Sequence, residues 1–214
     1  MTFHILVSRS SGETEIDTFL KQKDNLSVLA FISEFFHTGH DGVWILPQQT
    51  IRPRVGSKKG LRPDYLFGGY DALGMNWWVL ELKGAHETVC VKDSEGIGFS
   101  GVVRNGISQL KSYMEFCTEN SETLRKAYGV KAFSEPKGIL IVGREKEFVK
   151  NEEKQRLRRD FTKKNPRIQI RTYDSLIRRI MRDGYIQYKL PWLSTIIFNF
   201  LTCEPTDDYW YFDS

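Results

Sequence analysis

Three charged residues at short, fixed spacings are the strongest candidates for chemistry in this chain: Asp64, Glu81 and Lys83. Asp64 follows Arg62-Pro63, and Glu81-Leu82-Lys83 ends an aromatic and apolar run. Two carboxylates supply the hard oxygen ligands that Mg2+ prefers, while the ion keeps waters and contacts a substrate phosphate. A lysine beside such a metal could orient or help deprotonate an attacking water. The pattern predicts hydrolysis of a phosphodiester.

The run at residues 77–83 has the composition of a buried strand. Residues two apart on a strand share a face, so Glu81 and Lys83 point to one side and Leu82 to the other. Burying two charges is costly unless they pair with each other, with a metal or with water. A functional site explains their presence, and the alternative is a simple ion pair at the strand end.

Asp64 starts a second short apolar run at residues 64–67, which Gly68-Gly69 closes. The segment 70–76 has the length of a hairpin connection, with Gly74 as a turn former. If the runs at 64–67 and 77–83 pair as antiparallel neighbours, Asp64 approaches Glu81.

Apolar residues recur at near-helical spacing between residues 103 and 117, where Gln109 and Tyr113 share one face. The alternative for this pair is incidental polar residues of an amphipathic helix. Further along, the pattern predicts a strand in the run 136–144, a helix at 152–164, a strand at 168–173 and a helix at 174–180 with Asp174 as N-cap. The order of elements is mixed α/β.

Pro63-Asp64 and Glu81-Leu82-Lys83 resemble the first and second elements of the PD-(D/E)xK nuclease superfamily. The Gln109-x-x-x-Tyr113 pair resembles the third motif of its RecB-like members. The order of several segments resembles the Shedu family of bacterial antiphage nucleases over about residues 13–182. These segments are Glu15 to Leu20, Pro63-Asp64, Glu81 to Lys83, Gln109 to Tyr113, Gly138 to Arg144 and Tyr173 to Leu176.

The resemblance implies a restriction-endonuclease-like α/β core with a central mixed sheet flanked by helices. It also implies a Mg2+-dependent enzyme of the prokaryotic cytoplasm, with Mn2+ as a possible substitute, that cleaves or nicks DNA, phage DNA in particular, as a homo-oligomer. The implied catalytic residues are Asp64, Glu81, Lys83, Gln109 and Tyr113. Family members usually carry a regulatory domain before the nuclease part, whereas about a dozen residues precede the matching segment here.

A further carboxylate often comes from the first helix of this nuclease fold. The candidates are Glu15, in the segment 15–20, and Glu34, in the segment 28–36. The surroundings of Glu15 resemble the opening motif of the family, so we expect Asp64, Glu81 and Glu15 to bind the metal. The alternative for either glutamate is a solvated position on a helix.

Length and composition predict one nuclease domain over residues 1–214, with a core at about 13–182 and a C-terminal extension at 183–214. The chain has 214 residues, 40% of them hydrophobic, which can bury a substantial core. The segments 53–60 and 87–101 are expected to be flexible.

The formal charge is +4, but residues 144–183 alone hold 14 Lys/Arg against 7 Asp/Glu. Such a basic region suits a phosphate backbone, although it could also be a pair of solvated helices.

Export and membrane insertion are not expected. The N-terminus lacks the organisation of a secretory signal, and the apolar segment 190–201 is too short to span a bilayer. Cys90, Cys117 and Cys203 are widely separated and odd in number, which indicates reduced thiols. Two other functions stay open: a catalytically silent nucleic-acid-binding or regulatory module with the nuclease fold, and a protein-interaction domain in which the charged residues are structural ion pairs.

Overall fold

The computed structural model describes residues 3–22, 25, 28, 43–48, 51, 60–71, 74–94, 96–128 and 135–180. Expectations for Glu34, for most of the segment 53–60, for Cys203 and for the extension 183–214 lie outside these residues. None of the described helices is long and apolar enough to cross a membrane.

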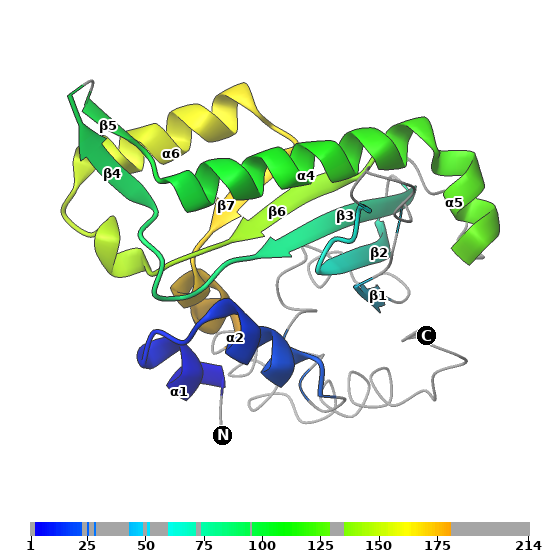
Figure 1. Cartoon of the computed structure of the whole chain (residues 1–214), viewed down its shortest axis with the longest axis horizontal. Coiled ribbons are helices and arrows are strands. Elements are labelled where there is room, and N and C mark those ends of the chain that lie inside the picture. Colours follow the sequence, from blue (N-terminus) through cyan, green and yellow to red (C-terminus); the bar gives the residue numbers. More distant parts are fainter. Residues whose placement is uncertain are drawn as a thin grey trace.

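A five-stranded mixed sheet forms the centre of the described structure, in the order β1-β2-β3-β6-β7 (Figure 1). β1 to β3 are antiparallel neighbours, whereas β3, β6 and β7 run parallel. The mixed α/β architecture expected from the sequence is confirmed. The strands are β1 Val43–Pro47, β2 Tyr65–Asp71, β3 Gly74–Leu82, β6 Lys137–Ile141 and β7 Ile168–Arg171.

Helices cover both faces of this sheet, so the domain has three layers (Figure 1). Alternate residues of β3 belong to two separate hydrophobic cores, one on each face of the sheet. Trp78, Leu80 and Leu82 pack on the side of α1 and α2. Trp77 and Val79 pack on the side of α4. The helices are α1 Phe3–Ser8, α2 Glu13–Leu20, α4 Gly101–Glu119, α5 Ser121–Tyr128, α6 Glu152–Lys164, the short 3-10 helix Glu145–Glu147 and the helix at residues 173–180.

The segment 87–101, expected from the sequence to be flexible, contains a two-stranded hairpin. β4 (Cys90–Asp93) pairs with β5 (Gly96–Phe99). The Glu147 carboxylate anchors the base of the hairpin by accepting hydrogen bonds from the backbone N–H groups of Val89 and Cys90, both at 2.7 Å. Lys154 Nζ lies 2.8 Å from the same carboxylate. A side chain distant in sequence therefore orders this segment.

Arg144 joins three elements at the carboxyl end of the parallel strands. Its guanidinium donates two hydrogen bonds to Asp174, at 2.9 and 2.8 Å, and a third to the carbonyl of Val7 in α1. Asp174 also accepts a hydrogen bond of 2.7 Å from the backbone N–H of Glu145. The helix begins at Tyr173, so Asp174 lies in its first turn and is not the N-cap. The Asp174 carboxylate instead holds the Arg144 guanidinium in place.

Replacing Asp174 by Asn should destabilise the fold by about 1–2 kcal/mol at pH 7, because a charge-assisted bidentate pair is lost. Arg144 and the N–H of Glu145 hold the pKa of Asp174 below its usual value, although burial acts in the opposite direction. A lowered native pKa stabilises the fold above the unfolded pKa, and this contribution is lost as the pH falls through the native pKa. The difference between native and variant in urea unfolding should therefore shrink toward pH 3.

The matched control is Glu122→Gln, which breaks the Glu122–Lys126 pair, with both side chains 79% exposed. An exposed helix pair contributes about 0.5 kcal/mol or less. Equal losses for Asp174→Asn and the control would contradict the anchoring role of Arg144.

Candidate active site

Hydrogen bonds on both sides fix the carboxyl end of β3, where Glu81 and Lys83 lie. The backbone N–H of Leu82 donates to Asp64 Oδ2 at 2.7 Å, so the expected approach of the two strand ends is confirmed. The N–H of Lys83 donates to the carbonyl of Ile141 at 2.8 Å, and the Tyr173 hydroxyl donates to the carbonyl of Lys83 at 2.7 Å. The chain leaves the sheet at a defined point.

Glu81 is the most unusual residue of this site because its carboxylate is buried. The residue is only 4% exposed, and Lys83 Nζ lies 2.7 Å from its Oε1 atom. Within the described part of the chain, the buried Oε2 atom has no hydrogen-bond partner. Burial raises the pKa of Glu81, while Lys83 and the Tyr113 hydroxyl act in the opposite direction. The Oε2 oxygen accepts no hydrogen bond from the described residues, although the Tyr113 hydroxyl lies near the carboxylate.

Asp64 shares the electrostatic field of Glu81. Burial, followed by the charge of Glu81, raises the pKa of Asp64 to about 7, and the hydrogen bond from the Leu82 N–H only partly offsets this. Two nearby carboxylates in a poorly solvated place ionise together only at a cost that positive charge must offset, and Lys83 supplies part of that charge. The pair is therefore an unfavourable arrangement for anions alone and a favourable one around a positive charge.

Lys83 stays protonated at neutral pH. Burial alone would lower its pKa, but the hydrogen bond and the charge of Glu81 outweigh burial, and the pKa is raised. Its side chain is 14% exposed and also lies 3.7 Å from Glu13 Oε2. A permanent cation can orient a water or stabilise negative charge, whereas it is a poor proton acceptor.

The carboxylate that the first helix brings to this cluster is Glu13, whereas Glu15 lies elsewhere. Glu13 contacts Lys83 and raises the pKa values of both Asp64 and Glu81. Glu15 is 43% exposed and forms its ion pair with Arg9. Residues two apart on a helix lie about 200° apart around the axis, so only one of the two can face Lys83.

Three long-range hydrogen bonds hold α2 and the residues before it in place. Asp17, one turn after Glu13, accepts hydrogen bonds from the Tyr65 hydroxyl at 2.8 Å and from Gln48 Nε2 at 3.2 Å. Before the helix, the carbonyl of Ser11 accepts a hydrogen bond of 3.0 Å from the N–H of Ala85. The start of α2 is thereby tied to the chain directly after Lys83.

α4 places Gln109 and Tyr113 beside the cluster. Tyr113 is 6% exposed, and burial followed by the charges of Glu81 and Asp64 raises its pKa. Gln109 is exposed, and the Tyr113 hydroxyl donates a hydrogen bond of 3.5 Å to the carbonyl of Arg62. The helix lies close to the sheet at Gly106, where a Cβ atom would come within 2.7 Å of the Leu140 side chain. The structure thus brings together all the expected catalytic residues and leaves Glu15 outside.

The donor set fits a hard divalent cation at Asp64 and Glu81. No three His, Cys, Asp or Glu side chains of the described residues converge as a ready metal cage. Mg2+ does not need such a cage, because it is commonly held by one or two carboxylates, waters and substrate phosphates. The unpartnered Oε2 atom of Glu81 and the raised pKa of Asp64 are the two observations that match such an ion.

Fold and site together define an α/β protein with a mixed sheet and a cluster of acidic residues and a lysine around the buried Glu81 at the end of a central strand. A family model described as Shedu protein SduA, C-terminal, matches residues 10–177. The chain belongs to this Shedu family. Comparison with curated proteins gives no match.

The charge conflict at Asp64 predicts a specific pH dependence of stability in the presence of EDTA. Because its native pKa is raised, the native state binds more protons than the unfolded chain between about pH 4 and 7, and stability falls as the pH rises through this window. Asp64→Asn removes the conflict and should be more stable than the native chain at pH 8, on the order of 1–3 kcal/mol.

Urea unfolding between pH 4 and 8 checks this, with Glu15→Gln as a control that changes a carboxylate outside the cluster. The two variants should differ at pH 8 and converge toward pH 4. Destabilisation of Asp64→Asn at pH 8 would show that Asp64 is not held in a repulsive field.

Proposed function

We propose that this protein is a Mg2+-dependent deoxyribonuclease of the PD-(D/E)xK type that acts in antiphage defence. The observation that carries the proposal is the buried carboxylate of Glu81, which has Lys83 on one oxygen and no partner within the described residues on the other. A purely structural ion pair has no need of an unsatisfied buried oxygen, which is costly. Membership of the Shedu family supports the defence role.

In this proposal Asp64 and Glu81 hold the metal, and Glu13 adds negative charge beside them. When bound, Mg2+ supplies positive charge to the scissile phosphate and lowers the pKa of a bound water. Lys83 orients that water and stabilises charge on the phosphate, because it is protonated and partly open to the surface. Gln109 and Tyr113 position the Glu81 carboxylate and the DNA backbone. The family resemblance adds a cytoplasmic location and assembly as a homo-oligomer.

The test is cleavage of supercoiled, linear and single-stranded DNA in Mg2+, Mn2+ or EDTA. Glu81→Gln, Asp64→Asn and Lys83→Ala should each lower the rate by at least about 100-fold, because each removes a charge at the reacting phosphate. Glu13→Gln should lower it less, and Glu15→Gln should cut as the native chain does. Mg2+ should also raise the melting temperature of the native chain, and this shift should be lost in Glu81→Gln.

A native chain that binds DNA without cutting it would select the alternative, a catalytically silent nucleic-acid-binding or regulatory module. Cutting by Glu81→Gln at the native rate would show that another site carries the activity.

A second surface supports nucleic acid as the substrate. A basic groove of about 350 Å³ lies between α6 and β7, and its described lining contains no carboxylate. Arg171 in β7 lies opposite Ile141, which lies opposite Leu82, so the groove is two strands, or roughly 10 Å, from the end of β3. The lining residues are Arg158, Arg159, Thr162, Lys163, Gln169, Ile170 and Arg171.

Neutralising two exposed cations of the basic groove should weaken DNA binding and its salt dependence. For Arg159→Gln/Lys163→Gln, the slope of log K against log salt should become less steep by about 2, since each phosphate contact contributes about 0.9. Fluorescence anisotropy with a DNA duplex in EDTA measures this. Arg125→Gln/Lys126→Gln on α5 removes an equal charge away from the groove. An equal change in affinity and salt slope for this control would show that the effect comes from the net charge of the protein alone.

A further inference from the structure

A groove runs along α4 directly beside Lys83. It has a volume of about 550 Å³, and its floor and walls include Lys83 and Tyr113 of the candidate site. We call it the α4 groove. Its lining residues are Gly60, Leu61, Lys83, Val102, Asn105, Ser108, Gln109, Ser112 and Tyr113.

One face of α4 lines this groove with short, uncharged hydrogen-bonding side chains. Asn105, Ser108, Gln109 and Ser112 follow the i, i+3, i+4, i+7 spacing of a single helix face, and all four are exposed. Asn and Ser are weak helix formers compared with Lys, Glu or Ala. Neither helix propensity nor packing explains why Asn105, Ser108 and Ser112 occupy exposed positions of this 19-residue helix.

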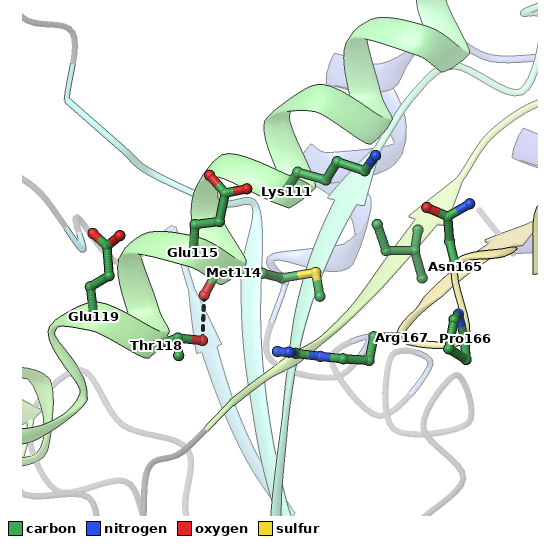
Figure 2. A pocket seen from close by; sticks show the side chains of 9 residues that line it. Lys111, Met114, Glu115, Thr118, Glu119, Asn165, Pro166 and Arg167 are labelled. Atoms are coloured by element: carbon green, nitrogen blue, oxygen red, sulfur yellow. Dashed lines mark hydrogen bonds between the residues drawn. The ribbon is translucent and has the colours of Figure 1, made fainter.

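Charge distinguishes the α4 groove from a second hollow on the same helix. The described lining of the α4 groove contains Lys83 and no Asp or Glu. The second hollow, of about 520 Å³, lies between the later turns of α4 and residues 165–168, and Figure 2 shows Glu115 and Glu119 on its α4 side together with Lys111. In the second hollow Lys111 and Arg167 balance the two carboxylates, whereas the described lining of the α4 groove has one cation and no carboxylate, which is the more favourable setting for a polyanion.

We propose that the α4 groove seats the phosphodiester backbone of the strand being cut, and that Asn105, Ser108 and Ser112 donate hydrogen bonds to its phosphates. The inference rests on the proposed function and extends it to the path of the substrate. Hydroxyl and amide donors bind phosphate oxygens without reading sequence, and they set the register of the backbone. Here that register brings one phosphate to Lys83, which lines the same groove. Asn105, Ser108 and Ser112 are positioning residues.

The decisive variant is Ser108→Glu, which puts a carboxylate in the groove. Glutamate forms helices better than serine, so α4 should remain intact. Affinity for a DNA oligonucleotide, measured by fluorescence anisotropy in EDTA, should fall about tenfold or more, because like charges are brought together. Lys111→Gln changes the net charge equally on the part of α4 that lines the second hollow, and its affinity should stay within about twofold of native.

A second set of variants separates lost hydrogen bonds from an added charge. The triple variant Asn105→Ala/Ser108→Ala/Ser112→Ala should weaken binding and raise KM more than it lowers kcat, while the Mg2+-induced melting shift stays as in the native chain. Ser108→Thr keeps the hydroxyl and should bind as the native chain does. Native-like affinity and KM in both Ser108→Glu and the triple variant would overturn the proposal.

The outcomes separate this inference from the nuclease proposal. If the native chain binds DNA without cutting it and Ser108→Glu still loses binding, the groove is supported and the nuclease proposal fails. If the native chain cuts DNA and Ser108→Glu binds and cuts equally well, the groove proposal alone fails. Absence of both binding and cutting in the native chain overturns both.

Discussion

The buried carboxylate of Glu81 is the constraint on which the arrangement of this domain depends. Removing a carboxylate from water costs several kcal/mol, and a single lysine contact repays only part of that cost. The fold brings four groups around it: Lys83 directly after β3, Asp64 directly before β2, Tyr113 from α4 and Glu13 from α2. Elements from both faces of the sheet therefore meet at one strand end, although their apolar side chains build two separate cores.

The charges at this strand end favour a dication in a way that a structural ion pair would not. Glu13, Asp64 and Glu81 face one protonated lysine, so full ionisation leaves an excess of negative charge in a poorly solvated place. Without a metal, Asp64 relieves the excess by holding its proton to about pH 7. Such a site is electrostatically prepared for positive charge, at some expense to the stability of the domain. Destabilised clusters of this kind are typical of functional sites.

Local patterns in the sequence predicted the parts of the site that depend on local geometry. Alternation along β3 placed Glu81 and Lys83 on one face, and helical spacing placed Gln109 beside Tyr113. Choosing between Glu13 and Glu15 required the orientation of α2, which Asp17 fixes through Tyr65, 48 residues away. The β4–β5 hairpin similarly depends on Glu147, more than 50 residues along the chain. Such long-range contacts leave no periodic signal in the sequence. A local signal that favours Glu13 is its position beside the buried stripe of Ile16, Phe19 and Leu20 on α2.

α4 links the stability of the fold to the geometry of the site. Its buried face packs on β3 and β6, with a close approach to Leu140 at Gly106, and Tyr113 on the same helix lies near Glu81. Its exposed face lines the groove in which Lys83 lies. A shift of this helix would change the surroundings of the buried carboxylate and the width of the groove together. The packing of α4 against the sheet at Gly106 and the positions of Glu81 and Lys83 therefore depend on each other, because a shift of the helix would displace the charged residues and a shift of those residues would displace the helix.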